Sequence, residues 1–241
     1  MPHGSVSSQK TSTYNTSYKI VPQLTDIREC IIIANMVEEK LKPFCEKIMI
    51  VGSIRRERMQ ASKIAIVCIP ITEVVEVFPD RYSQLDMFSP PPQPKKVRMR
   101  LSGFVEAVEG FGFIELGDAA TGKFVKIVYD RKIAIELTMA EDYNFGFLVA
   151  LRTGDAYYAK DVLAKAWYRK GFVNTEDGLR KRKECEKARS AVTGKRYGQW
   201  KLKAEINHPW KPPHFFTEES FFEFIDVAYL PPYQRFVPYG R

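Results

Sequence analysis

Apolar residues recur at helical spacing between residues 24 and 41, which predicts an amphipathic helix near the start of the chain. Thr25 or Asp26 can cap this helix at its start, and Pro43 follows its end. The recurring apolar positions are Leu24, Ile27, Ile31, Ala34 and either Met36 or Val37.

Shorter runs with strand character follow this helix. Apolar residues cluster or alternate between turn residues over 47–51, 63–69, 123–129 and 132–138, so we expect four strands there. Residues 72–78 either extend the sheet or form a short helix, and residues 98–117 suggest a helix followed by a strand. Residues 118–122 predict a turn. A proline-rich run within residues 82–96 excludes a helix or a central strand and predicts an exposed, partly extended loop.

The second half of the chain has a different character. Residues 145–170 predict a helix with an interruption at Arg152-Thr153-Gly154-Asp155, and residues 218–225 predict a last helix. From residue 172 onward the chain turns basic and then rich in Pro and Trp. We therefore divide it into a domain over 20–145 and a second domain over 146–241, preceded by a polar disordered tail at residues 1–19.

Composition and charge narrow the range of partners. The formal net charge of +8 and a pI near 9.2 favour a polyanion, and 13% aromatic residues leave rings for stacking on bases. The four cysteines form no C-x-x-C pair and the three histidines complete no zinc spacing, so we expect reduced thiols. With no apolar run of membrane-spanning length and no hydrophobic secretory segment, the sequence predicts a cytoplasmic protein without a membrane partner.

Two neighbouring segments carry candidate chemistry. Gly52-Ser53-Ile54-Arg55-Arg56 predicts a turn that opens a helix, and such a turn offers backbone N–H groups to a phosphate. The strand that follows begins at Lys63. Side chains two residues apart on a strand share a face, so Lys63 and Ala65 point the same way.

Two further segments follow these two along the chain, Ala134-Ile135-Glu136-Leu137 and Leu151-Arg152-Thr153-Gly154. In this order the four segments resemble the family X DNA polymerases, which belong to the polymerase beta-like nucleotidyltransferase superfamily. The resemblance covers roughly residues 45–241 and implies an α+β fold, with a mixed-sheet palm flanked by helices and a smaller α/β thumb. It is closest to the minimal palm-and-thumb form of phages, bacteria and viruses. Further similar segments are Ala164 with Lys170-Gly171-Phe172, and the ending at 217–222 and 229–235. The four segments are the Gly-Ser-x-Arg-Arg entry at 52–56, the strand with Lys63 and Ala65, Ala134-Ile135-Glu136-Leu137, and Leu151-Arg152-Thr153-Gly154.

The resemblance implies a binding site for NTP or dNTP. Ser53 and Arg56 would contact the triphosphate, Arg55 would brace the fold, and the turn at residues 151–154 would cradle the sugar. The nucleotide-binding residues implied in this way are Gly52, Ser53, Arg56, Arg152, Thr153 and Gly154.

The resemblance also implies a metal centre that this chain departs from. Family members hold two Mg²⁺ or Mn²⁺ ions with a carboxylate pair on one strand and a third acid on the next. Here Lys63 and Ala65 stand at the paired positions, and Glu136 is the surviving acid of the catalytic set. An ammonium and a methyl group cannot ligate a cation, so we assign no metal site.

We therefore expect an inactive or severely impaired nucleotidyltransferase scaffold in which Lys63 and Glu136 form an ion pair. A simpler interpretation is an edge-strand lysine and an unrelated solvated acid. The sequence is also compatible with an active enzyme that has a non-standard metal site, with a non-enzymatic accessory protein, and with a deliberately disabled form of an enzyme that has acids at positions 63 and 65.

A possible partner motif lies in the proline-rich loop. Gln84-Leu85-Asp86-Met87-Phe88 resembles the Q-L-x-L-F peptide by which bacterial replication proteins bind the sliding clamp, with Gln84, Leu85, Met87 and Phe88 as the contacting residues. This implies a bacterial or phage-infected host cell. Alternatively, Leu85 and Phe88 fold back on the core.

Ten Lys and Arg residues between 180 and 203 form either a solvated helical face or a nucleic-acid surface. Tyr197, Trp200 and Trp210 lie within or near this stretch and favour a surface that follows a DNA or RNA backbone. DNA is the expected polymer, in replication or repair. The candidate contacts are Arg180, Lys181, Arg182, Lys183, Lys195, Arg196 and Lys201.

Overall fold

A five-stranded sheet forms the centre of the first lobe in the computed structural model, which describes residues 24–77, 94–176, 178–189, 196–206 and 213–237. Its strands are β2 Cys45–Val51, β4 Lys63–Pro70, β7 Phe113–Gly117, β8 Phe124–Tyr129 and β9 Ile133–Met139. The order is β2-β4-β9-β8-β7, in which β4 and β9 are parallel and the other pairs antiparallel. The four strands expected from the sequence are confirmed, with small shifts at their ends.

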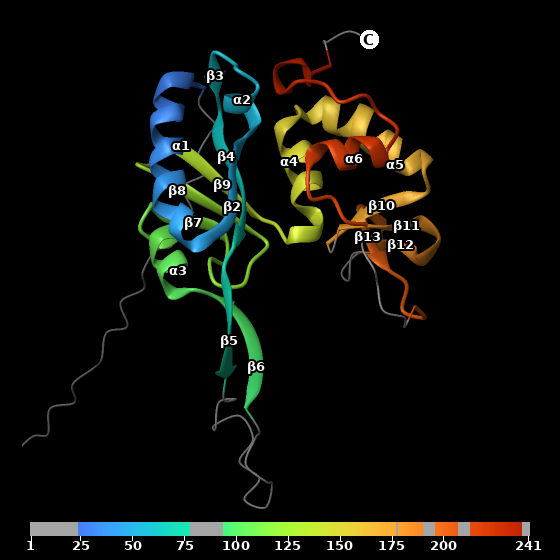
Figure 1. Ribbon diagram of the computed structural model, residues 1–241, viewed down its shortest axis with the longest axis horizontal. Helices are drawn as coiled ribbons and strands as arrows, with labels where there is room; N and C mark the ends of the chain where they lie inside the picture. The colour runs from blue at the N-terminus through green and yellow to red at the C-terminus, as the bar shows by residue number, and fades with distance from the viewer. Residues whose placement is uncertain (1–23, 78–93, 177, 190–195, 207–212, 238–241) are drawn as a thin grey trace, which may run out of the picture.

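Two helices cover one face of this sheet, α1 Ile27–Leu41 and α3 Ser102–Glu109 (Figure 1). Asp26 caps α1 by accepting a hydrogen bond from the Arg28 N–H at 2.8 Å. The expected inward positions were partly wrong, because Ile31 and Leu24 are exposed. The inward stripe of α1 is rotated from the expected one and consists of Cys30, Ile33, Ala34, Val37 and Leu41.

Residues 72–78 were expected either to extend the sheet or to form a short helix, and the described part of this stretch, residues 72–77, does neither. β5 Thr72–Val77 pairs with β6 Lys95–Arg100 in a separate two-stranded hairpin that projects away from the sheet (Figure 1). The expected loop over 82–96 is therefore too long at its end, since residues 95 and 96 belong to β6. Residues 78–93 lie outside the described ranges, so the clamp contacts at Gln84, Leu85, Met87 and Phe88 stay a prediction.

α4 Phe145–Thr153 follows the first sheet, and we describe it with the elements after it as the second lobe. One side of α4 packs on the open face of the first sheet through Phe145 and Val149, against Val67 and Ile69. Its other side enters the core of the second lobe with the π-helical segment η3 Tyr158–Ala164, α5 Lys165–Arg169 and α6 Glu218–Phe224. The expected interruption of the helix at 152–155 is confirmed, because α4 ends at Thr153.

Within the described residues, the basic stretch is mostly strand, with the short helical turn η4 at Arg182–Glu184, so the solvated helical face that was one of its two open interpretations is wrong. It forms strands of a four-stranded sheet with the order β11-β10-β13-β12. The strands are β10 Phe172–Thr175, β11 Gly178–Lys181, β12 Cys185–Arg189 and β13 Arg196–Leu202. Leu179, Cys185 and Ala188 of these strands are buried, and Arg180 is buried beside Leu179.

Short elements complete an α+β fold. They are β1 Thr25–Asp26, η1 Lys42–Phe44, α2 Gly52–Arg55, β3 Gln60–Ala61, η2 Asp142–Asn144, η4 Arg182–Glu184 and η5 Pro232–Gln234. Within the described ranges, none of the helices has both the length and the apolar character that crossing a membrane requires. Residues 1–23 lie outside these ranges, so the tail expected at 1–19 stays a prediction.

Candidate functional site

A cleft of about 550 Å³ brings together segments that lie far apart in the sequence. It is bounded by α2, the start of β4, the middle of β9 and the end of α4. Its lining residues are Gly52, Ser53, Arg56, Ser62, Lys63, Ala65, Glu136, Leu151, Arg152, Gly154, Asp155, Ala156 and Ala159. Of the six residues predicted to bind a nucleotide, five line this cleft. The sixth, Thr153, is fully buried behind it.

The register of the sheet explains why Lys63, Ala65 and Glu136 meet. β4 and β9 pair so that Ala65 lies opposite Glu136, and Lys63 lies opposite Ala134. Paired residues share a face of the sheet, and residues two apart on a strand do so too. Ile64 and Ile66 point the other way, into the core beneath α1. The shared face stays open at Lys63 because α4 covers only the later part of β4.

The predicted ion pair between Lys63 and Glu136 is confirmed, with Nζ and Oε2 2.7 Å apart. Lys63 is 46% exposed and Glu136 is 13% exposed, so water screens the pair on the lysine side. Lys126 of β8 lies opposite Glu136 in the register and forms its own ion pair with Glu115 at 2.7 Å. The carboxylate of Glu136 is thus flanked by cationic side chains.

Gly52 allows α2 to pack directly against β4. Its φ of +71° lies in the left-handed region that favours glycine, and a Cβ there would lie 3.3 Å from the Cβ of Ala65. This close approach places Ser53 at the cleft. The Ser53 hydroxyl accepts a hydrogen bond from Arg56 at 3.3 Å, so the two residues predicted to contact a triphosphate lie side by side.

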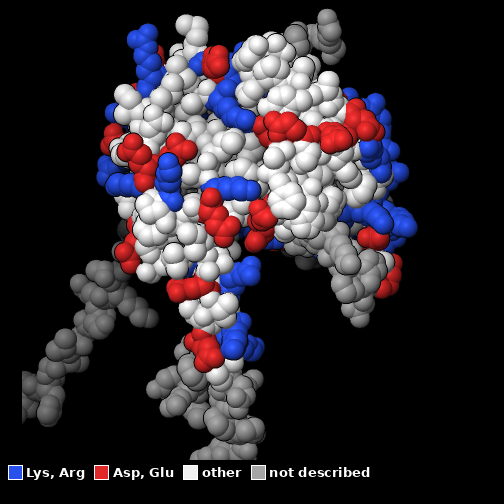
Figure 2. Space-filling view, in the orientation of Figure 1, with Lys and Arg blue, Asp and Glu red and all other residues white. Residues whose placement is uncertain are grey.

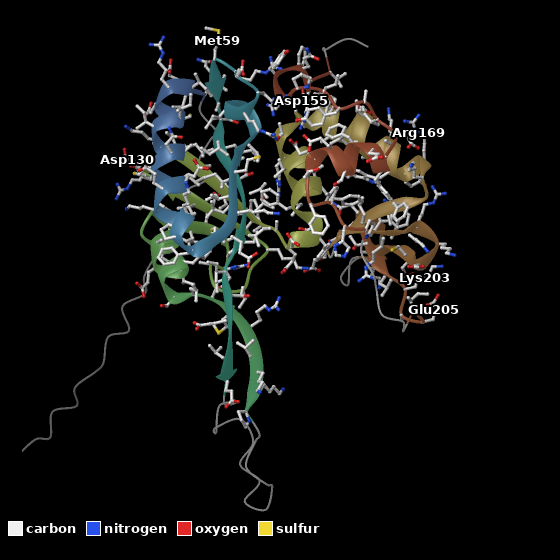
Figure 3. The ribbon with its side chains drawn as sticks, viewed as in Figure 1. Met59, Asp130, Asp155, Arg169, Lys203 and Glu205 are labelled. Carbon is white, nitrogen blue, oxygen red and sulfur yellow. The ribbon has the colours of Figure 1, made fainter. Side chains whose placement is uncertain are left out.

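Two guanidinium groups line the cleft with unused donors. Arg56 donates to the carbonyl oxygen of Thr153, and Arg152 stacks over the ring of Phe124 at 5.3 Å. The Nε atoms of both arginines are buried and have no hydrogen-bond partner within the described residues. Burial lowers the pKa of Arg56, while Asp155 opposes this effect. Figure 3 shows Asp155 close to the end of α4, between the two lobes. An anion in the cleft would relieve the desolvation of Arg56.

Arg55 faces away from the cleft and joins the lobes. It donates to the Thr153 hydroxyl at 2.8 Å and to Glu218 of α6 at 2.6 Å. Glu218 also pairs with Arg235, which is fully buried and donates from Nε to the Leu230 carbonyl oxygen at 2.7 Å. These contacts agree with the bracing role expected for Arg55.

The residues of the cleft do not fit the two-ion centre of the family. On the shared face of β4 and β9, Glu136 is a carboxylate already paired with Lys63, and Ala65 offers no ligand. Asp155 lines the cleft, but its Oδ1 accepts the Tyr158 N–H at 2.6 Å. Among the residues that the structure describes, no group of three or more His, Cys, Asp and Glu side chains is arranged to hold a metal ion.

Only some of the residues predicted to bind nucleic acid lie on one exposed surface. Lys181, Arg182 and Lys183 are exposed at the end of β11 and in η4, and Arg182 lies over the ring of Tyr168 at 4.3 Å. Lys201 of β13 pairs with Glu186 at 3.1 Å. Arg180 is buried, so it does not belong to this surface. Lys195 and the side chain of Arg196 lie outside the described part of the chain.

On the face seen in Figure 2, acidic and basic side chains are interspersed, and basic ones gather along the outer edge of the second lobe. A single continuous basic face is therefore not seen in this view. Any nucleic-acid surface on this side is local to that edge.

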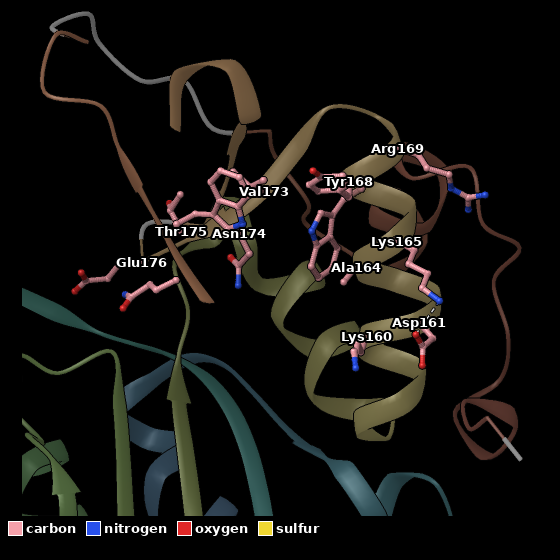
Figure 4. Close-up of a pocket in the computed structure, with 13 residues that line it drawn as sticks. Lys160, Asp161, Ala164, Lys165, Tyr168, Arg169, Val173, Asn174, Thr175 and Glu176 are labelled. Carbon is pink, nitrogen blue, oxygen red and sulfur yellow. Dashed lines mark ion pairs between the residues drawn. The ribbon is translucent and has the colours of Figure 1, made fainter. Parts of the chain in front are cut away.

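A second cavity, of about 860 Å³, lies in the second lobe and was missed from the sequence (Figure 4). Trp167, Tyr168 and Trp200 line it together with Asn174 and Gln199. Its residues come from η3, α5, β10 and β13, which are separated by up to about forty positions, so spacing alone gave no sign of it. The signal available in the sequence was Trp200 within the basic stretch.

Comparison with protein-family models and with curated proteins found no match for the chain. Its function therefore has to be inferred from the residues and their geometry. These give a cleft with three cationic side chains, Arg56, Lys63 and Arg152, and two acids, of which Glu136 is neutralised by Lys63. The chemistry that this arrangement supports is the binding of a phosphate-bearing anion.

Proposed function

We propose that this protein is a nucleotidyltransferase-like scaffold of the polymerase beta type whose cleft binds the triphosphate of NTP or dNTP. The single observation that carries the proposal is that all four segments of the family X resemblance contribute residues to one cleft. These residues are Gly52, Ser53 and Arg56, then Lys63 and Ala65, then Glu136, and finally Leu151, Arg152 and Gly154. The meeting of four separate segments at one cleft supports the resemblance. In this proposal the first lobe is the palm and the second lobe is the thumb.

The cleft supports phosphate binding by its charge and by its unused donors. Arg56 and Arg152 are held in place by Thr153 and Phe124, so their guanidinium groups lose little freedom when an anion binds. The Ser53 hydroxyl supplies a further polar group beside Arg56. Gly154 leaves part of the cleft wall without a side chain, which suits the sugar of a nucleotide.

The residues of the same cleft predict a weak phosphoryl-transfer activity. Family enzymes use a carboxylate pair to hold the ions that activate the attacking hydroxyl, and such ions supply several kcal/mol of transition-state stabilisation. Here Lys63 and Ala65 occupy those positions, and no step through a metal ion can be derived from the residues present. We infer a role in which binding, rather than catalysis, is retained.

DNA is the expected second ligand, in replication or repair. The exposed Lys181, Arg182 and Lys183 support contact with a phosphate backbone, and the nearby rings of Tyr168 and Trp200 offer surfaces for stacked bases. Binding to a bacterial sliding clamp through residues 84–88 belongs to the same proposal.

Primer extension on a gapped DNA template tests the proposal, with Mg²⁺ and with Mn²⁺. We expect negligible extension by the unaltered protein, because the metal ligands are missing. The Lys63→Asp/Ala65→Asp double variant restores the acids of the family and is expected to gain measurable extension. Nucleotide binding, followed by isothermal titration calorimetry, should persist in the unaltered protein.

The two measurements separate the competing functions. Robust extension by the unaltered protein would contradict the impaired-enzyme proposal and favour an active nucleotidyltransferase. Absence of nucleotide binding under every condition would contradict the binding-scaffold proposal. Arg56→Ala should weaken binding, whereas Arg28→Ala, an exposed arginine on α1, serves as the control.

A further inference from the structure

We propose that the cleft binds nucleoside triphosphate in its metal-free form, and that the ammonium of Lys63 takes the place of the divalent cation as the counter-charge. The inference rests on the proposed function, since it concerns the same cleft. It adds the ionic form of the ligand and a role for Lys63 in binding it.

The ammonium of Lys63 occupies the space that a cation beside Glu136 would need. Lys63 stands on the face of β4 that lines the cleft, and its Nζ lies 2.7 Å from Glu136. A cation ligated by Glu136 would have to share this space with the ammonium or displace it. Two like charges so close repel each other, and the repulsion grows away from bulk water. A nucleotide that brings Mg²⁺ into the cleft therefore meets a charge of the same sign.

The side chains of the cleft carry an excess of positive charge without any metal. Arg56, Arg152 and Lys63 contribute three positive charges, against Glu136 and Asp155. The ion pair with Lys63 occupies Glu136, and Asp155 accepts a backbone hydrogen bond from Tyr158. The remaining excess is positive, so a phosphate group can enter without a cation to mask the acids.

The side chain of Lys63 can change partners at little cost. It is nearly half exposed, and an ion pair that is open to water contributes little stability. The lysine stem is flexible and its three donors rotate, so the ammonium can move from the Glu136 carboxylate to a phosphate oxygen. Glu136 then lies opposite Lys126 of β8, which also pairs with Glu115, so the charge of Glu136 is compensated only in part.

The experiment is a calorimetric titration of the full chain with ATP, once in EDTA and once with Mg²⁺ in excess of the nucleotide, at matched ionic strength. We expect the affinity in EDTA to be equal to that in Mg²⁺ or up to tenfold higher. Lys63→Ala should lower the affinity in EDTA at least tenfold. Lys95→Ala is the matched control, because it removes one exposed lysine from β6, which projects away from the cleft. It should change the affinity less than twofold.

The Glu136→Gln variant is an independent test, because it keeps Lys63 and removes the carboxylate that competes with the phosphate for the Lys63 ammonium. We expect it to bind ATP in EDTA at least as tightly as the unaltered protein. If Lys63→Ala fails to fold, as judged by circular dichroism, Lys63→Met replaces it, because methionine keeps most of the length of the side chain without its charge.

The outcomes distinguish this inference from the proposed function. Binding that requires Mg²⁺ would overturn the inference and leave the proposed function standing. Equal losses in Lys63→Ala and Lys95→Ala would also overturn it, because Lys63 would then contribute only general charge. No binding in either condition would overturn the proposed function itself.

Discussion

Glu218 is a buried carboxylate shared by two arginines from distant parts of the chain. It accepts a hydrogen bond from Arg55 at 2.6 Å and pairs with Arg235, which has no exposed surface. Arg55 also donates a hydrogen bond to the hydroxyl of Thr153. The backbone carbonyl oxygen of Thr153 accepts a hydrogen bond from Arg56. The buried network thus ends at the wall of the cleft and fixes the position of Arg56.

We expect Glu218→Gln to lower the free energy of unfolding by about 3–5 kcal/mol, because it leaves a buried guanidinium group without its counter-charge. Glu219→Gln is the matched control, since Glu219 is the next residue of α6 and is exposed. It should cost less than about 1 kcal/mol, the usual range for a charge in the first turn of a helix. Urea unfolding followed by circular dichroism measures both values, and equal losses would contradict a role for the network in stability.

At the scale of elements, the contact between α4 and the extended segment before α6 joins the parts of the second lobe. The Gly146 N–H donates to the Phe215 carbonyl oxygen at 2.8 Å. A Cβ on Gly146 would overlap the carbonyl group of Thr217, which is backbone and cannot rotate away. α4 can therefore approach this segment only because residue 146 has no side chain.

Gly146→Ala should destabilise the protein by about 1–3 kcal/mol, because overpacking must push α4 and residues 215–217 apart. In an unconstrained helix the same change would stabilise by up to about 1 kcal/mol, so the sign of the effect is diagnostic. Gly103→Ala in α3 is the comparison, since its Cβ would meet the ring of Phe44, a side chain that can shift. Thermal unfolding measures the loss of stability in both variants. If Gly146→Ala loses no more stability than Gly103→Ala, the close approach of α4 does not require glycine at position 146.

Elements that depend on local patterns of residues were predicted from the sequence, whereas elements that depend on contacts between distant residues were not. β2 and β4 were predicted because their apolar runs are local, and the end of α4 was predicted because Gly154 interrupts the helix. The pairing of β5 with β6 was not predicted, because its two strands are separated by a proline-rich stretch. The basic residues on β11 and β12 were left open between a solvated helical face and a nucleic-acid surface, because the stretch has no regular apolar pattern that would predict a strand.

The same difference between local and long-range interactions applies to the candidate site. Lys63 and Glu136 were expected to meet because the family X resemblance implies that both positions belong to one site, whereas strand geometry alone placed only Lys63 and Ala65 on one face. The exposure of Lys63 depends on where α4 stops covering β4, which no local pattern of residues indicates. The cavity lined by Trp167 and Trp200 could not be found from spacing, because it exists only after β10 and β13 pair.

At the scale of the whole molecule, the net charge of +8 has to be weighed against its distribution. Acidic and basic side chains are mixed on the face shown in Figure 2, so the excess charge acts locally. Lys181 and Lys183 are exposed on the second lobe, at the end of the sheet that also forms the aromatic cavity. We therefore expect a polyanion to contact these exposed lysines of the second lobe.

We expect the protein to bind single-stranded DNA with an affinity that falls steeply as salt increases, since binding to phosphates releases counterions. Lys181→Glu/Lys183→Glu should weaken binding and reduce the slope of log K against log salt by roughly 0.7 for each phosphate that is no longer neutralised. Lys95→Glu/Lys96→Glu on β6 makes the same change in net charge at a distance from the second lobe. Fluorescence anisotropy with a labelled oligonucleotide at several salt concentrations measures each slope.

If the β6 variant lost as much slope as the second-lobe variant, binding would depend on overall charge and no local surface would be needed. A slope near zero in the unaltered protein would instead exclude nucleic acid as a ligand, because a partner held through phosphates must respond to salt.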